Sequence, residues 1–104
     1  MKTISAREVQ KRLKKGEILN IIDVREAYEF QEGHIPGAMN IPLSLLEFRV
    51  HELDKKEPYI FLCHSGARSS LAVQYLESLG LDVTNMEGGM LAWEGEMEQS
   101  SCQQ

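Results

Sequence analysis

The chain has 104 residues, of which 42% are hydrophobic and 26% charged, a balance that suits one globular domain and a length too short for two. Its formal net charge of −5 argues against binding to nucleic acid or to an anionic membrane, because both usually require a basic surface. With only two cysteines, no signal-peptide pattern and no apolar run of membrane-spanning length, the sequence predicts a soluble cytoplasmic protein, for which we expect a monomer.

The first half of the chain predicts one helix and then short strands and helices in turn. Ser5 and Glu8 have the spacing of a capping box, which begins a helix that ends near Gly16. Residues 18–24 are a nearly continuous apolar run, as expected for a strand buried on both faces of a parallel sheet. The next predicted elements are a helix over 26–32, a strand over 38–41 and a helix over 43–53.

The second half continues this alternation. Residues 59–62 form an apolar strand, and a helix is predicted over 69–80 after a short loop. Residues 81–85 predict a last strand, and the glycine pair at 88–89 begins a short helix. Alternating strands and helices are typical of an α/β domain with a mainly parallel sheet. We assign residues 1–94 to this domain and 95–104 to a polar, flexible tail.

Cys63 stands between the strand at 59–62 and a helix that follows after a short loop. Ligands of open α/β sheets bind beyond the carboxyl ends of the strands, and the first N–H groups of a helix lack intrahelical partners. These N–H groups can converge on an anion. Together with Arg68, they predict a Cys63 thiol with a lowered pKa, a nucleophile that needs no histidine base.

We name Cys63 as the candidate catalytic residue. The candidate substrate-binding residues follow it directly in the chain: His64, Ser65, Gly66, Ala67, Arg68 and Ser69. Arg68 can bind an anionic donor, which we favour, or form an ion pair with Asp23 or a nearby glutamate. His64 is expected at the rim of the pocket without an acid–base role, and Ser69 can either contact the sulfur or cap the helix.

Other polar and large residues have structural roles as their first interpretation. We expect a buried salt bridge or a loop hydrogen bond for Asp23, with a part in shaping the pocket as the alternative. Met90 and Trp93 are expected to pack in the core, with a role as a wall of the pocket as the alternative. His34 is expected to lock a turn, since no second residue has the spacing of a metal ligand. Cys102 is interpreted as an incidental thiol, with a resolving thiol as the alternative.

Three blocks of the sequence resemble the motifs of rhodanese-type sulfurtransferases. The first consists of residues 22–26, Glu29, 33–38 and 40–42, the second is the loop 63–69, and the third is 88–93. They occur in the right order, and the resemblance covers nearly the whole chain. It implies a rhodanese-like α/β fold with a central five-stranded parallel sheet flanked by helices on both faces.

The resemblance also implies a reaction. Cys63 would attack the outer sulfur of a small anionic donor such as thiosulfate, sulfite would leave, and a persulfide would remain on Cys63. The acceptor would be a small thiol, a thioredoxin-like protein or, in the test tube, cyanide. The resemblance implies no metal and no organic cofactor.

Two alternatives remain open. Phosphatases of the cell-cycle dual-specificity type and arsenate reductases share the architecture, but such phosphatases place five residues between Cys and Arg, whereas four separate Cys63 from Arg68. The shorter loop suits a sulfur atom better than a phosphoryl group. The other alternative is a persulfide carrier or regulatory rhodanese-like module that serves a partner protein.

Overall fold

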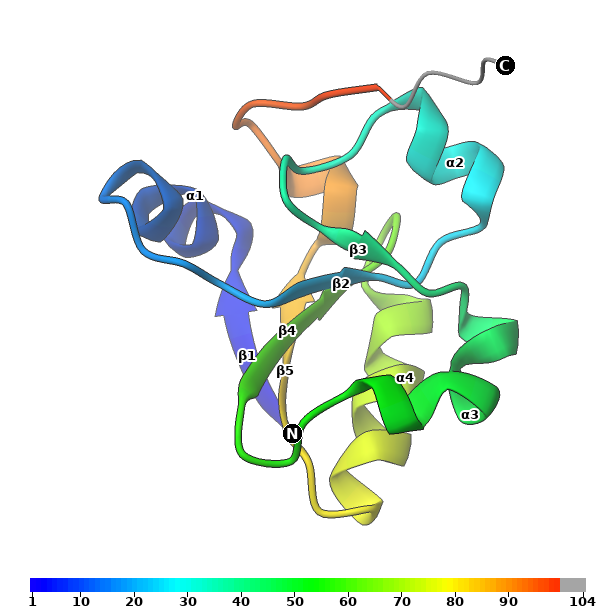
Figure 1. Cartoon of the computed structure of the whole chain (residues 1–104). Coiled ribbons are helices and arrows are strands. Elements are labelled where there is room, and N and C mark those ends of the chain that lie inside the picture. The colour runs from blue at the N-terminus through cyan, green and yellow to red at the C-terminus, as the bar shows by residue number, and fades with distance from the viewer. Residues whose placement is uncertain (100–104) are drawn as a thin grey trace.

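The computed structural model describes residues 1–99, and a five-stranded parallel sheet forms its centre (Figure 1). The strands are β1 (Lys2–Ser5), β2 (Ile21–Asp23), β3 (Met39–Asn40), β4 (Pro58–Leu62) and β5 (Asp82–Glu87). They lie in the order β1-β5-β4-β2-β3, and all four pairings are parallel. The predicted fold class is therefore confirmed.

Helices cover both faces of this sheet. They are α1 (Ala6–Lys14), α2 (Ala27–Glu32), α3 (Leu46–Arg49) and α4 (Ala67–Ser78), with 3₁₀ turns η1 (Leu43–Leu45), η2 (Val50–Glu52) and η3 (Gly89–Ala92). Neighbouring strand residues feed separate cores: Ile21 packs in the cluster on the α1 side and Ile22 in the cluster on the α4 side. This alternation explains the continuous apolar run in the sequence, because both faces of β2 are buried. None of the helices within residues 1–99 is long and apolar enough to cross a membrane.

Two local expectations need correction. No strand was predicted over β1, whose side chains are mostly exposed and give no burial signal, yet it pairs with β5 along the edge of the sheet. The single helix predicted over 43–53 is instead η1, α3 and η2 in succession. At the two ends of this segment, the N–H groups of Leu45 and Leu53 donate to the carbonyls three residues earlier in the chain. Such 3₁₀ hydrogen bonds are common at helix termini.

Only one of the two hydrogen bonds of the predicted capping box of α1 is present. The Ser5 hydroxyl accepts a 3.0 Å hydrogen bond from the Glu8 N–H, as in a capping box. The Glu8 carboxylate, however, accepts from Arg12 one turn later at 3.0 Å. A complete capping box occurs at α2, between Glu26 and Glu29, where none was predicted.

The end of the described chain runs back to the loop after α2. Glu98 and His34 exchange two backbone hydrogen bonds of 3.0 and 2.9 Å, as an isolated antiparallel bridge. This bridge ties a residue beyond 94 to the domain. The second cysteine, Cys102, lies outside the described residues.

The topology brings three loops to one edge of the sheet. Asp23 pairs with Leu62 in register, so β2 and β4 end side by side, and β5 lies on the other side of β4. The carboxyl ends of parallel strands lie at the same edge, where ligands of such sheets bind. The loop to α2, the loop to α4 and the turn η3 therefore meet around Cys63.

Candidate active site

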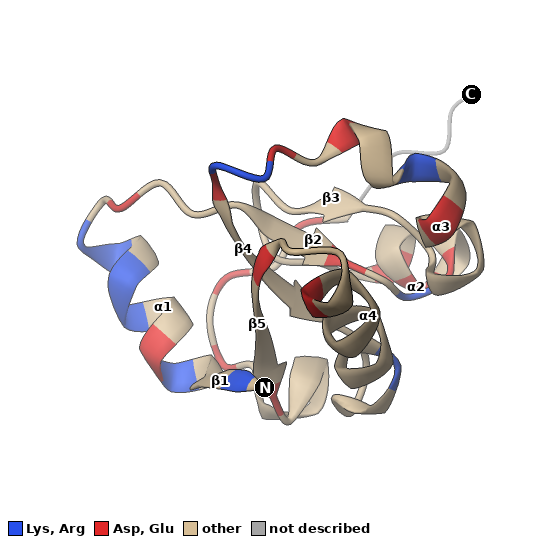
Figure 2. Cartoon of the chain, turned by 90° about the horizontal axis from the view of Figure 1, so that it is seen from below, with Lys and Arg blue, Asp and Glu red and all other residues tan. Residues whose placement is uncertain are grey.

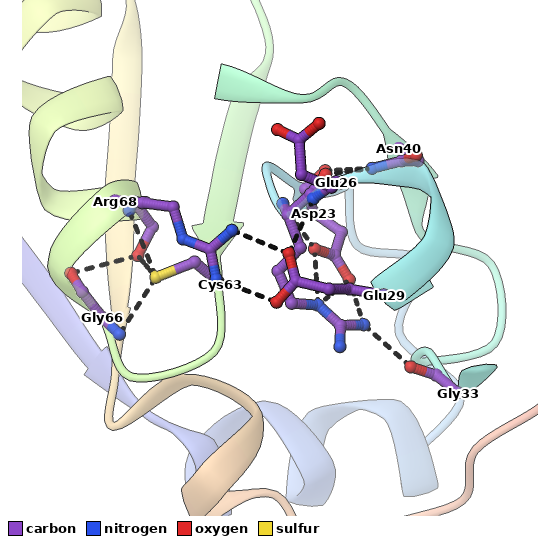
Figure 3. Close-up of polar contacts among 10 residues, drawn as sticks. Asp23, Glu26, Glu29, Gly33, Asn40, Cys63, Gly66 and Arg68 are labelled. Carbon is purple, nitrogen blue, oxygen red and sulfur yellow. Dashed lines mark hydrogen bonds and ion pairs between the residues drawn. The ribbon is translucent and has the colours of Figure 1, made fainter. Parts of the chain in front are cut away.

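Cys63 directly follows β4 and is 1% exposed. Its Sγ accepts hydrogen bonds from the backbone N–H groups of Gly66, at 3.0 Å, and Ser69, at 3.4 Å (Figure 3). Gly66 has φ 106°, in the left-handed region that favours glycine, and this conformation turns the chain back over the sulfur. The loop thus aims main-chain donors at the sulfur atom itself.

Ser69 is a second point of contact with the sulfur. Its hydroxyl is fully buried, lies 3.5 Å from Cys63 Sγ and donates to Asn85 Oδ1 on β5 at 2.5 Å. The same hydroxyl lies 3.3 Å from Gly66 O, and because it has a single proton to donate, Asn85 Oδ1, Gly66 O and the sulfur compete for that proton. The sequence analysis did not identify Asn85 as a residue of the site. A signal was present, because Asn85 is a polar residue within a predicted strand of the buried sheet.

These contacts decide the pKa of Cys63. Burial alone would raise it, because desolvation disfavours the thiolate. Hydrogen bonds from the Ser69 side chain and from the N–H groups of Ser69, Gly66 and Ser65 act in the opposite direction and hold the pKa of the Cys63 thiol below its usual value. The lowering has the predicted direction.

Arg68 forms a two-pronged ion pair with Glu29 of α2. Its Nη1 and Nη2 donate to the two carboxylate oxygens at 2.8 and 3.0 Å, as Figure 3 shows. The hydrogen bond from Arg68 lowers the pKa of Glu29 to about 2, and the pair raises that of Arg68. Of the two ion-pair partners considered for Arg68, the glutamate is therefore right and Asp23 is wrong.

Asp23 is instead paired with Arg25, both nearly buried, through contacts of 2.8 to 3.1 Å. The same guanidinium donates to Gly33 O at 2.8 Å, and the Asn40 amide donates to the carbonyls of Asp23 and Arg25. The expected buried salt bridge of Asp23 is confirmed. It braces the loop between β2 and α2, and therefore the helix that carries Glu29.

Gly89 fits η3 against the Cys63 loop. A Cβ at this residue would lie 2.6 Å from His64 O and closer still to Cys63 O. The close approach lets Met90 and Leu91 donate their N–H groups to Cys63 O and His64 O at 2.9 and 3.0 Å. The sequence marked this glycine pair only as the start of a helix, and its clamping contact was missed.

The remaining candidates lie around the mouth of the site. His64, Ser65 and Ala67 are exposed, and His64 borders a groove that is also lined by Met90 and Trp93. Met90 and Trp93 are partly buried against the core as well, so both interpretations of these two residues hold.

The His34 side chain has the expected structural role. His34 Nδ1 donates to Phe30 O at 2.7 Å, and its ring stacks on the Phe30 ring at 3.8 Å. These contacts fix the end of α2. Within residues 1–99, no cluster of His, Cys, Asp and Glu could hold a metal ion.

A family model, curated relatives and a solved structure identify the family of the chain. The family model "Rhodanese-like domain" matches residues 5–96. A Bacillus subtilis protein named "Putative sulfurtransferase YtwF" is 42% identical over 92% of this chain and 93% of its own length, and a "Putative sulfur carrier protein YrkF" of that species is 38% identical over 91% of this chain and 52% of its own length. The crystal structure of a rhodanese-like domain protein from Staphylococcus aureus superimposes with a TM-score of 0.91 and 38% identity, covering 97% of this chain and 100% of the other. The chain therefore belongs to the rhodanese-like domain family, whose named relatives support sulfur transfer in general.

Proposed function

We propose that the protein is a sulfurtransferase that carries sulfur as a persulfide on Cys63. The observation that carries the proposal is the convergence of donors on one sulfur atom: N–H groups of Gly66 and Ser69 and the nearby Ser69 hydroxyl. Donors placed in this way stabilise a thiolate before reaction and the same thiolate when it leaves. Both properties are needed by a cysteine that receives and then releases sulfur.

The reaction has two displacement steps. The Cys63 thiolate attacks the outer sulfur of a donor, such as thiosulfate or a persulfide, and sulfite or a thiolate leaves with the bonding electron pair. An acceptor thiolate, or cyanide in an assay, then attacks the outer sulfur of the Cys63 persulfide. The Cys63 thiolate leaves, and its lowered pKa makes it a good leaving group. A small thiol or a thioredoxin-like protein is our proposed acceptor.

Phosphoryl transfer fits the site less well. The backbone N–H groups of Gly66 and Ser69 both point at Sγ, and Cys63 is 1% exposed, which leaves little space for three equatorial phosphoryl oxygens. Arg68, the loop residue that could bind an oxyanion, already has both carboxylate oxygens of Glu29 as partners. These contacts favour transfer of a single sulfur atom.

A carrier function is the second candidate, and the relative named as a sulfur carrier supports it. A carrier would accept sulfur from a partner protein and show no turnover with thiosulfate and cyanide. Turnover with small donors and acceptors would favour the enzyme. For either function we propose a monomer in the cytoplasm, where a reducing environment keeps a catalytic thiol free.

Intact-mass analysis after exposure to a sulfane sulfur donor tests the proposal. We expect the protein to gain one sulfur atom, which a thiol acceptor removes. Cys63→Ser should abolish the gain, and Cys102→Ser, the matched control, should retain it. A gain that survives in Cys63→Ser and disappears in Cys102→Ser would overturn the proposal.

A further inference from the structure

A groove opens beside the Cys63 loop and has room for the part of a donor that stays outside it. Its volume is about 510 Å³, which is in the range of small-molecule sites. Its apolar lining comes from three segments and consists of Tyr28, Met90, Trp93 and Met97. His64, the residue after Cys63, borders the groove. A donor whose outer sulfur enters the loop would therefore rest its remaining atoms here.

Both guanidinium groups at this mouth already have carboxylate partners. Arg25 is bound to Asp23, and Arg68 is bound to both oxygens of Glu29. Glu32 adds another carboxylate to the groove. More than half of the lysines and arginines of the chain lie within residues 1–15, and Figure 2 shows them gathered on α1, away from α2.

This distribution of charge distinguishes between two classes of sulfur donor. Thiosulfate carries two negative charges, and its sulfonate would stay at the mouth, where it needs a cation. The carboxylate of Glu29 neutralises Arg68 through a two-pronged pair, so thiosulfate meets no net positive charge at this guanidinium unless it displaces Glu29. The persulfide of a small uncharged thiol is neutral in the form R–S–SH that the Cys63 thiolate attacks, so it brings no sulfonate that needs a cation at the mouth.

We propose that Glu29 selects the sulfur donor: by occupying Arg68 it disfavours thiosulfate, and the site takes its sulfur from a small-molecule persulfide whose organic group lies in the apolar groove. The inference rests on the persulfide function proposed for Cys63. It makes Glu29 a specificity-determining residue, and it makes any contact of Arg68 with an anionic donor depend on Glu29.

The two loading steps balance as follows. With a persulfide, the Cys63 thiolate bonds to the outer sulfur of R–S–SH, the S–S bond of the donor breaks, and R–S⁻ leaves with the electron pair. With thiosulfate, the same attack breaks the S–S bond of the dianion and releases sulfite as a dianion. Neither step needs an oxidant or a reductant. The steps differ in the charge of the leaving group. The thiolate R–S⁻ carries one negative charge and sulfite carries two, and both must pass the carboxylates of Glu29 and Glu32.

The test measures the rate at which Cys63 gains one sulfur atom, by intact mass, from thiosulfate and from the persulfide of 2-mercaptoethanol. The variant is Glu29→Gln, which removes the charge that neutralises Arg68 and one of its two acceptor oxygens, and keeps an oxygen that can bond the Glu26 N–H in the cap of α2. The matched control is Glu26→Gln, which removes the same charge from the same helix end but does not touch Arg68. A double variant, Glu29→Gln with Arg68→Ala, shows whether any gain passes through Arg68.

We expect wild type to load faster from the persulfide than from thiosulfate. Glu29→Gln should raise the ratio of the thiosulfate rate to the persulfide rate by about two- to fivefold, the scale of a partly exposed charge pair. Glu26→Gln should change neither rate, and the double variant should lose the gain. Persulfide loading of each variant also reports that its site is folded.

The proposal is overturned if Glu29→Gln leaves the ratio of the two rates unchanged, or if Glu26→Gln shifts it equally. Glu29→Asp provides a second route should the glutamine variant fold poorly, since the shorter side chain withdraws the carboxylate from Arg68 and should raise the thiosulfate rate in part; an unchanged ratio there is equally decisive. Absence of loading from both donors in wild type would instead refute the persulfide function itself.

Discussion

The Ser69 hydroxyl donates to Asn85 Oδ1 at 2.5 Å while it lies 3.5 Å from Cys63 Sγ. A helix after the active-site loop and a strand at the far end of the chain are joined by this bond. Because the hydroxyl has one proton, Asn85 both fixes the position of Ser69 and competes with the sulfur for that proton.

Ser69→Ala should raise the pKa of the Cys63 thiol. The variant removes the side-chain hydrogen bond that opposes the effect of burial, and it keeps the backbone N–H of residue 69. The midpoint of the pH dependence of iodoacetamide alkylation measures this pKa. Ser70→Ala is the control, because the Ser70 hydroxyl contacts Met1 and Gln74 and not the sulfur. An unchanged midpoint in Ser69→Ala would assign the lowering to the backbone alone.

Asn85→Ala should have the opposite effect on reactivity and a cost in stability. Without its acceptor, the Ser69 hydroxyl can turn its proton to Cys63 Sγ, so the alkylation midpoint should fall or stay, and not rise. Loss of the buried hydrogen bond between Ser69 and Asn85 should lower the free energy of unfolding by about 0.5–1.5 kcal/mol. Urea unfolding measures the second effect, and a raised midpoint would show that Asn85 acts only by holding Ser69 in place.

Gly89→Ala should disrupt the site through the backbone. The new Cβ would collide with the carbonyls of Cys63 and His64, and φ at this residue is +54°. Gly80→Ala is a matched control, with φ +89° and open space around the new atom, so it carries only the conformational cost of about 1–2 kcal/mol. We expect Gly89→Ala to lose more stability than Gly80→Ala and to lose sulfur loading. Equal losses in urea unfolding would contradict the clamping role.

The pair of Glu29 and Arg68 should make stability depend on pH in acid. The pKa of Glu29 falls from 4.5 to about 2 on folding, chiefly through the hydrogen bond from Arg68, so its contribution is complete above pH 4.5 and is lost as pH falls towards 2. The contribution should be about 1 kcal/mol, because the pair is partly exposed.

Comparison of wild type with Glu29→Gln by urea unfolding at several pH values measures this contribution. The difference in unfolding free energy should be constant from pH 5 to 7 and should vanish near pH 2. A difference that does not change with pH would mean that the glutamine variant loses packing rather than charge.

The features that sequence predicted well are local in the chain. An apolar strand, Cys63, Gly66 and a helix follow each other within a few residues, so the placement of the sulfur at a sheet edge and the direction of its pKa shift could be derived. Alternation of strands and helices likewise sufficed for the α/β fold. The short edge strand β1 was not predicted, because its mostly exposed side chains show no alternation of apolar and polar residues.

The features that were missed depend on tertiary contact. Glu29 lies 39 residues from Arg68 and Asn85 lies 16 from Ser69, and no periodicity links either pair. Sequence could suggest that Arg68 has an acidic partner, but it could not choose between Asp23 and a glutamate. Arg25 decides between them, because it forms the ion pair with Asp23, two residues earlier in the chain. Arg68 therefore pairs with Glu29 of α2.

The clamp formed by η3 has a consequence for the order in which the protein matures. The carbonyls of Cys63 and His64 receive their hydrogen bonds from Met90 and Leu91, residues that leave the ribosome long after the cysteine does. A nascent chain that already contains Cys63 therefore still lacks the support that fixes its loop, and the thiol acquires its full reactivity only when nearly the whole domain has been synthesised. We therefore expect activation of the cysteine to be a late event of biosynthesis, coupled to completion of the fold.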